Sequence, residues 1–258
     1  MNSVARACLI AALVTLLTGC PEAPEDKVKG YKSKAETGDA KAQFELGISY
    51  STGIGVAESK EQAVFWYRKS AEQGYELAQL ELGYCYAHGE AVAKDDVQAA
   101  VWFHKAADQG HTQAQLILGT KYYNGQGVAK DDAQAVAWWS KAAEKGHPLA
   151  QLYLANSYYK GEGTEKNIKQ AVFWYLKVAK KGSITAQTKL GHCYAHGEGV
   201  AKDDREAYAY WNLAGITSEG ARRELADLEK KLSREEIIAG QQRTKELQKE
   251  IDEQSAKK

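Results

Sequence analysis

Two histidines have the spacing of metal ligands. His192 and His196 lie four residues apart, so on a helix their imidazole rings would share one face. A zinc site needs further ligands, but no third ligand follows at helical spacing and the glutamate of an HExxH motif is absent. His88 occupies the position equivalent to His196 further upstream. The pattern therefore predicts polar residues on a solvent-facing helix, and we assign no metal site. Whether the two histidines alone bind a metal is not decided by the sequence.

Other signatures of catalysis are missing from the sequence. It contains no Walker loop, no glycine fingerprint of a dinucleotide site and no Gly-x-Ser-x-Gly elbow. Strings of Lys-Asp-Asp begin at Lys94, Lys130 and Lys202 and offer paired carboxylates, but their aspartates are explained as helix caps. We therefore predict no catalytic residues, no cofactor and no enzyme activity.

The N-terminus has the layout of a secretory signal peptide. One positive charge precedes an apolar run from Ala7 to Leu17, which is shorter than the ~18–20 residues of a spanning helix. The following Leu-Thr-Gly-Cys resembles the bacterial lipobox, which implies cleavage before Cys20 and lipidation of that cysteine. The alternative is an ordinary signal peptide with an incidental cysteine. We expect a signal peptide over 1–19, a tether with a partial helix over 20–37, and a membrane-anchored lipoprotein of the bacterial envelope facing the periplasm, in the inner or the outer membrane.

Composition narrows the class of partner. The 258 residues carry 34 basic and 34 acidic side chains, which argues against a nucleic-acid partner because such proteins normally have a basic excess. Hydrophobic residues make up 44% of the chain, enough for a sizeable core, and only 3 prolines are present, which suits long helices.

The sequence repeats every 36 residues. The dipeptide Ala-Gln recurs at this period, starting at Ala42, Ala78, Ala114, Ala150 and Ala186. Each unit reads as two helices: an amphipathic helix A that begins with this dipeptide, and a helix B that carries an aromatic pair such as Trp66-Tyr67. A capping residue precedes each helix B, and a Gln or Glu follows it three residues later. The capping residues are Ser59, Asp95, Asp131, Asn167 and Asp203. The aromatic pairs are predicted to form the core between neighbouring helices.

The repeat resembles the Sel1-like repeat, a relative of the tetratricopeptide repeat; residues 128–158 match its pattern closely. Five repeats span residues 38–215. The resemblance implies an all-α fold, an α-solenoid of antiparallel helix pairs in a right-handed superhelical stack. Residues 216–258 are expected to form C-terminal capping helices, one opened by a capping box at Ser233. Cys85 and Cys193 occupy the same position three repeats apart. They are predicted to be unpaired, because helices ~8–10 Å apart place them beyond the ~7 Å reach of a disulfide.

One stripe of helix A varies from repeat to repeat. We expect it to face away from the core, and in related solenoids this face lines the concave groove. We call it the helix-A stripe and predict that it binds a protein partner through Ile48, Glu81, Tyr84, His88, Ile117, Asn124, Tyr153, Asn156, Lys160, Lys189, His192 and His196. Apolar residues on a nominally solvated face indicate a contact patch. The alternative is that loops or a neighbouring turn cover them.

The resemblance also bears on function. Sel1-like proteins act as adaptors in envelope assembly and signalling, and some envelope members act as immunity proteins that neutralise secreted antibacterial toxins such as lipases. We expect a protein-binding scaffold, with an immunity protein as the specific hypothesis. The alternative is an enzyme that binds or hydrolyses β-lactams, as cysteine-rich relatives are reported to do.

Overall fold

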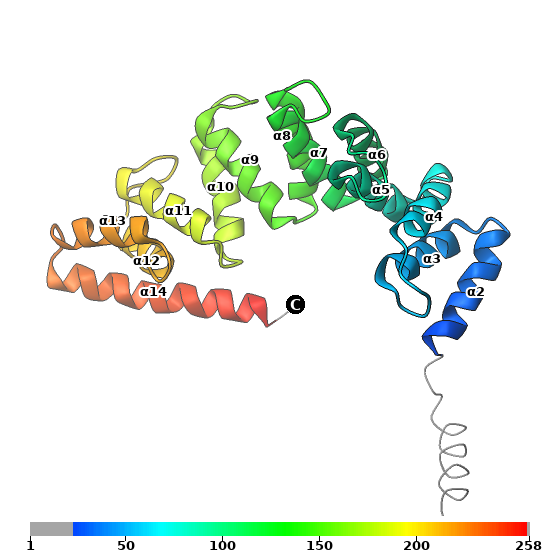
Figure 1. Ribbon diagram of the computed structural model, residues 1–258. Helices are drawn as coiled ribbons and strands as arrows, with labels where there is room; N and C mark the ends of the chain where they lie inside the picture. Colours follow the sequence, from blue (N-terminus) through cyan, green and yellow to red (C-terminus); the bar gives the residue numbers. More distant parts are fainter. Residues whose placement is uncertain (1–22, 257–258) are drawn as a thin grey trace, which may run out of the picture. The chain divides into compact units, whose positions relative to one another are not determined.

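The computed structural model describes residues 23–256, which form thirteen helices and no strand (Figure 1). Five of them are the A helices of the repeats: α3 (Ala40–Thr52), α5 (Glu76–His88), α7 (Thr112–Asn124), α9 (Pro148–Lys160) and α11 (Ile184–His196). Each is followed by its B helix: α4 (Lys60–Glu72), α6 (Asp96–Asp108), α8 (Asp132–Glu144), α10 (Ile168–Ala179) and α12 (Asp204–Gly215). One helix, α2 (Pro24–Glu36), precedes the repeats, and α13 (Glu219–Glu229) and α14 (Arg234–Ser255) follow them. The predicted all-α solenoid of helix pairs is confirmed, while the signal peptide and Cys20 lie outside the described residues.

The helices group into two compact units, one ending at Trp102 and the other beginning at Phe103. In the first unit α2 packs on α3, α3 on α4, and α4 on α5. In the second, successive helices pack on one another from α7 to α12, and α12 also contacts α13 and α14. Within each unit these helices therefore pack against their neighbours in the chain, as expected for a repeat protein.

The predicted caps start the B helices. The side chains of Ser59, Asp95, Asp131, Asn167 and Asp203 each accept a hydrogen bond from the backbone N–H three residues on. A full capping box is present at Ser233, where the Glu236 carboxylate also accepts from the Ser233 N–H at 2.8 Å. Such caps satisfy N–H groups that have no partner inside the helix.

The glutamine of each Ala-Gln dipeptide links one repeat to the helix before it. Its Nε2 donates to the backbone carbonyl eight residues upstream, at the end of the preceding helix. The five glutamines are Gln43, Gln79, Gln115, Gln151 and Gln187, and they bond to Ala35, Ala71, Ala107, Ala143 and Ala179 at 3.0–3.4 Å. All five side chains are buried. Because a buried amide without a partner is costly, these bonds explain why the period holds a glutamine.

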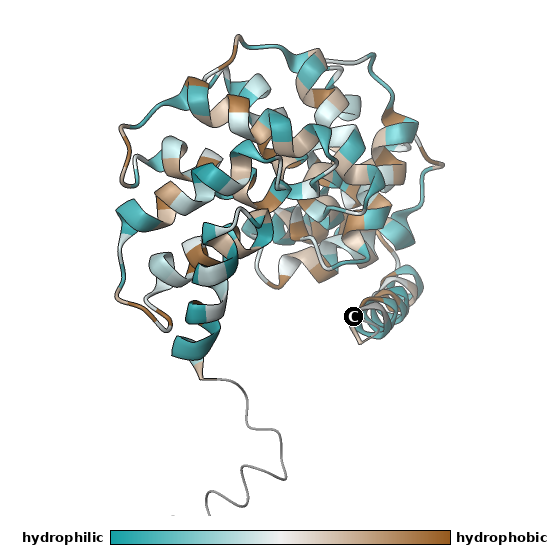
Figure 2. Ribbon diagram, turned by 90° about the vertical axis from the view of Figure 1, so that its right-hand side faces the viewer, coloured by the Kyte–Doolittle hydropathy of each residue, from teal (hydrophilic) through white to brown (hydrophobic). Residues whose placement is uncertain are grey.

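The aromatic pairs form the core, as predicted. Trp66, Tyr67, Trp138 and Trp139 are each at least nine-tenths buried, and Tyr175 has no exposed surface. Figure 2 shows hydrophobic and hydrophilic segments alternating along the helices, as expected for amphipathic helices whose apolar faces meet.

The loop between α5 and α6 has Ala91 where the equivalent loops have a glycine. Gly127, Gly163 and Gly199 adopt positive φ in the corner between helices A and B, and Ala91 takes the same conformation with φ 53°. A side chain disfavours this region, so the loop at Ala91 carries backbone strain that a glycine would avoid.

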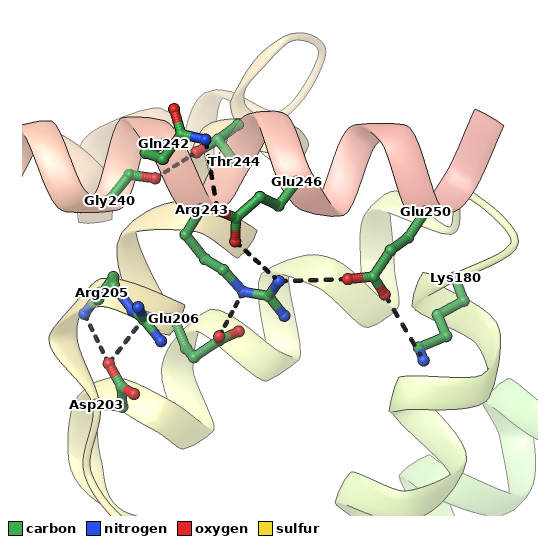
Figure 3. A network of polar contacts seen from close by, with 10 residues as sticks. All are labelled: Lys180, Asp203, Arg205, Glu206, Gly240, Gln242, Arg243, Thr244, Glu246 and Glu250. Atoms are coloured by element: carbon green, nitrogen blue, oxygen red, sulfur yellow. Dashed lines mark hydrogen bonds and ion pairs between the residues drawn. The ribbon is translucent and has the colours of Figure 1, made fainter. Parts of the chain in front are cut away.

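A cluster of charged side chains holds the last helix in place (Figure 3). Arg243 of α14 lies 2.6 Å from Glu206 of α12, and its side chain is 22% exposed. It also bonds to Glu246 and Glu250, and Glu250 lies 3.8 Å from Lys180. Burial alone would lower the pKa of Arg243, but the hydrogen bonds and charges of these glutamates raise it. The network ties α14 to the end of the repeats.

None of the helices between residues 23 and 256 has the length and apolar character to cross a membrane.

Candidate partner-binding site

The helix-A stripe is more buried than expected. Eight of its residues are half-buried: Ile48, Glu81, Tyr84, Ile117, Tyr153, Asn156, Lys189 and His192. His88, Asn124, Lys160 and His196 are exposed. The expectation that the stripe faces away from the core is wrong for Ile48 and Tyr153, because both pack against clusters of buried residues. Ile48 packs on the cluster that contains Phe44 of the same helix and Tyr67 of α4, the B helix of its own repeat.

Tyr153 shows the correction most clearly. Its ring centroid lies 5.0 Å from that of Trp139, a core residue of the preceding repeat. Tyr123 of α7 also contacts Trp139, and their ring centroids lie 5.5 Å apart. Tyr153 therefore belongs partly to the core and partly to the surface beside it.

That surface is hollowed into a pocket of about 280 Å³, which we call the aromatic pocket. It is lined by Thr120, Tyr123, Asn124, Trp139, Tyr153, Asn156, Ser157, Lys160 and Glu162, from α7, α8, α9 and the loop after α9. Four predicted residues of the stripe thus come together in one concavity: Asn124, Tyr153, Asn156 and Lys160. Concave sites with aromatic walls and a few polar groups are typical of binding pockets.

The first unit has a pocket at the same place in its repeats, which we call the acidic pocket. It measures about 290 Å³ and is lined by Ser51, Lys60, Ala63, Val64, Tyr67, Glu81, Tyr84, Cys85, His88 and Glu90. Burial raises the pKa of Glu81, and the negative charge of Glu90 raises it further. Glu90 lies 3.5 Å from Lys60. Three predicted residues, Glu81, Tyr84 and His88, are brought together here.

Ile48 on α3 and Ile117 on α7 line neither pocket, and the last three stripe residues, Lys189, His192 and His196, lie on α11. The rings of His192 and His196 stack with centroids 4.2 Å apart, and His192 lies 3.7 Å from the Glu198 carboxylate. Glu198 also accepts a hydrogen bond of 2.8 Å from Tyr159, whose ring faces the ammonium of Lys189 at 5.3 Å. In the part of the chain that the structure describes, no group of three or more His, Cys, Asp or Glu side chains is placed to hold a metal ion.

Cys85 and Cys193 are free, buried thiols. Burial raises the pKa of each to about 11. A thiol nucleophile needs a depressed pKa and an accessible sulfur, so neither side chain has the environment of a reactive cysteine.

Sequence reasoning missed the parts of both pockets that do not lie on helix A. Trp139 was assigned to the core alone, and Tyr123, Glu90 and Glu162 were not considered as site residues. The two glutamates occupy the same position of the loop between helices A and B, so the 36-residue period itself contained a signal for them.

Comparisons with known proteins agree with the fold. The Sel1 repeat model matches residues 40–75, 77–111, 112–147, 148–183 and 184–215. A search of curated proteins found no match. Among solved structures, a Sel1 repeat protein from Oxalobacter formigenes is 32% identical, covers 75% of this chain and 82% of its own, and superposes with a TM-score of 0.67.

Two further structures are similar. A protective antigen of uropathogenic Escherichia coli, c5321, which displays an SLR fold, is 27% identical with a TM-score of 0.57; the match covers 94% of this chain and 60% of that protein's length. The immunity protein Pa5087 from Pseudomonas aeruginosa is 22% identical with a TM-score of 0.42, over 84% of this chain and 83% of its own. The latter similarity is too weak to carry an argument about function. Since the five matched segments make up more than half of the chain, the protein belongs to the Sel1 repeat family.

Proposed function

We propose that the protein is a scaffold that binds a protein partner along the helix-A stripe, with the aromatic pocket as the main anchor point. The observation that carries the proposal is the pocket itself, in which three aromatic rings and several polar groups from two successive repeats enclose about 280 Å³. Side chains that fill such pockets commonly dominate the energy of an interface.

Photo-crosslinking tests this proposal. A photoreactive residue at Asn124 or Lys160, which are exposed at the pocket, should capture an envelope protein in living cells. The same residue at Gln134 or Lys141, exposed on α8, is the matched control. Capture of the same proteins in equal yield at the control positions would contradict binding along the stripe.

We propose further that the scaffold is anchored to the envelope by lipid on Cys20 and faces the periplasm. The Leu-Thr-Gly-Cys string after the apolar segment supports this location. Two or more acyl chains hold a protein at a membrane far more stably than one. Labelling with a fatty-acid probe should mark the wild-type chain but not Cys20→Ala, and the lipid anchor is excluded if both variants carry label and sediment with membranes.

The specific role we propose is that of an immunity protein for a secreted antibacterial toxin of the lipase type. The support is the sequence layout, in which a string that resembles a lipobox precedes Sel1-like repeats, together with an array that offers pockets. Co-expression with a toxin encoded beside it should protect cells in which the toxin is directed to the periplasm. Equal killing with and without the protein would remove this role but leave the scaffold proposal standing.

We propose no hydrolase activity for the chain itself. Neither described thiol has the pKa or exposure of a nucleophile. Turnover of a β-lactam, an ester or peptidoglycan by purified protein, lost on one point substitution, would restore the enzyme alternative.

A further inference from the structure

The last B helix has one face covered by another helix of the same chain. Four positions of α12 share this face because they follow one another at helical spacing, and we call the set the outer stripe of a B helix. In α12 the stripe consists of Arg205, Ala209, Leu213 and Ile216. Ala209 is fully buried and Leu213 is 6% exposed, and both belong to one core cluster with Leu247 of α14. The outer stripe of a B helix can therefore bind an amphipathic helix.

The equivalent stripe of α10 is exposed and basic. It consists of Lys169, Phe173, Lys177 and Lys180, all four of them exposed. The Phe173 side chain is 47% exposed, and the ammonium of Lys177 lies 4.5 Å from the centroid of its ring. In the part of the chain that the structure describes, no carboxylate pairs with Lys169 or Lys177. The stripe thus offers an apolar ring between positive charges that lack a counter-charge.

One end of this stripe already binds an acidic helix. The Glu250 carboxylate of α14 lies 3.8 Å from the ammonium of Lys180 (Figure 3). The next residue of α14, Ile251, packs on the core cluster that contains Val178 and Ala179 of α10. The other three stripe residues continue this surface along α10. The contact shows which chemistry suits the stripe, namely a helix that presents apolar side chains together with carboxylates.

The stripe of α4 provides a comparison within the same chain. It consists of Glu61, Phe65, Lys69 and Glu72, so a phenylalanine and a lysine occupy the same two positions as in α10. The Phe65 side chain is 46% exposed, and the ammonium of Lys69 lies 4.7 Å from its ring centroid. The two stripes differ mainly in charge, because α4 has glutamates where α10 has Lys169 and Lys180. An acidic helix is repelled by these glutamates and attracted by the lysines.

We propose that the outer stripe of α10 binds an acidic amphipathic helix of a protein partner. Apolar side chains of that helix pack on Phe173, and its flanking carboxylates pair with Lys169 and Lys177. An anionic membrane surface would also attract the lysines, but the equivalent stripe of α12 is covered by a helix, which favours a helix here. The stripe lies on a B helix, so this proposal does not depend on the helix-A stripe or on the aromatic pocket.

Two designed fluorescent peptides test the preference for an acidic helix. Both form amphipathic helices with the same leucine stripe, and the flanking residues are glutamate in one peptide and lysine in the other. Binding to the full chain in mild non-ionic detergent is measured by fluorescence anisotropy, with empty micelles as the blank. The acidic peptide should bind about tenfold more tightly than the basic one. Equal or tighter binding of the basic peptide, or no binding of the acidic one, would overturn the proposal.

Matched substitutions on the two stripes locate the site. Phe173→Ala and Lys177→Glu should each weaken binding of the acidic peptide about tenfold, because they remove the apolar anchor or reverse an attracting charge. Phe65→Ala and Lys69→Glu are the controls and should change the affinity by less than about twofold. All four side chains are exposed, so the fold should tolerate the changes, which a denaturant melt checks. Equal losses on both stripes, or no loss in Phe173→Ala, would contradict binding at α10.

Phosphatidylglycerol added to the micelles tests the other source of negative charge. It should displace much less of the bound peptide than an excess of unlabelled acidic peptide does. Equal displacement would mean that the stripe binds anionic lipid, and the proposal would be overturned. Crosslinking at Asn124 and Lys160 tests helix A, so the two proposals can fail separately.

Discussion

The hydroxyl of Tyr175 donates a hydrogen bond of 2.6 Å to Oδ1 of Asn156, which joins a fully buried core ring to the helix-A stripe. Asn156 was predicted from the sequence as a binding residue on a solvated face. The structure gives it a second task, because its oxygen satisfies the only polar group of a ring that has no exposed surface. Burial also raises the pKa of Tyr175, so the ring stays a neutral donor at physiological pH.

Removing this amide should destabilise the fold. Asn156→Ala leaves the Tyr175 hydroxyl buried without a partner and should lower the free energy of unfolding by about 1–3 kcal/mol, measured in a denaturant melt. Tyr175→Phe should cost about 0.5–1.5 kcal/mol. In the Tyr175→Phe background the alanine substitution should cost much less, and strictly additive effects would show that the bond contributes nothing.

Tyr153→Ala should affect both stability and binding. Loss of the ring that packs on Trp139 should destabilise the fold by about 1–2 kcal/mol, since the side chain is half-buried. Binding of a protein partner should weaken roughly thirtyfold, as for an anchor worth ~2 kcal/mol. Tyr153→Phe keeps the ring and should leave stability nearly unchanged. Trp138→Ala removes a buried ring and should lower the free energy of unfolding by ~3–5 kcal/mol. If Trp138→Ala leaves stability unchanged, the core face and the solvent face of the helices have been assigned the wrong way round.

Arg243→Ala should release the last helix. The substitution leaves Glu206, whose side chain is 13% exposed, without its partner, and should destabilise the docking of α14 by about 2–3 kcal/mol. Hydrogen exchange should then accelerate in α14 before it does in α12. Lys249→Ala is the control, because the Lys249–Glu253 pair is 3.8 Å long and its side chains are 79% and 60% exposed. That change should cost less than ~0.5 kcal/mol, and equal effects of the two substitutions would contradict the role of the network.

The thiols of Cys85 and Cys193 should not react with a thiol reagent in the folded protein. With a pKa of about 11, each is almost fully protonated at pH 8, and burial blocks access of a thiol reagent. The thiolate fraction, and with it the reaction rate, should rise about tenfold for each pH unit up to that range. Unfolding the processed, unreduced chain should expose two reactive thiols, and Cys85→Ala should leave one. A count of zero in the wild-type chain would reveal a disulfide.

The period of 36 residues made the elements of the fold predictable. Caps such as Asp131 and the buried pair Trp138-Trp139 recur because each repeat must solve the same packing problem, so the pattern appears five times in one sequence. The role of the glutamine in each Ala-Gln was not predicted, since its acceptor is a backbone carbonyl, and a sequence pattern does not identify such acceptors.

The candidate site was harder to predict because its residues are shared between repeats. Helix A packs on two B helices, and a single hydrophobic stripe does not reveal the second contact. Tyr153 was therefore assigned to the solvated face, although Trp139 lies beside it. The hydrogen bond between Asn156 and Tyr175, and the position of Glu162 at the pocket, depend on the path of the loop between α9 and α10. Helical periodicity does not describe the path of a loop.

The aromatic pocket takes its walls from two successive repeats, and this has an evolutionary consequence. Trp139 belongs to one repeat and Tyr153 to the next, so the pocket is a property of the junction rather than of either copy. A gene duplication or deletion that brings two unfamiliar repeats together would create a pocket with a new combination of walls while every copy keeps its own sequence. In such an array, recombination between repeats changes ligand preference in one step, where point mutation would have to alter several residues in turn.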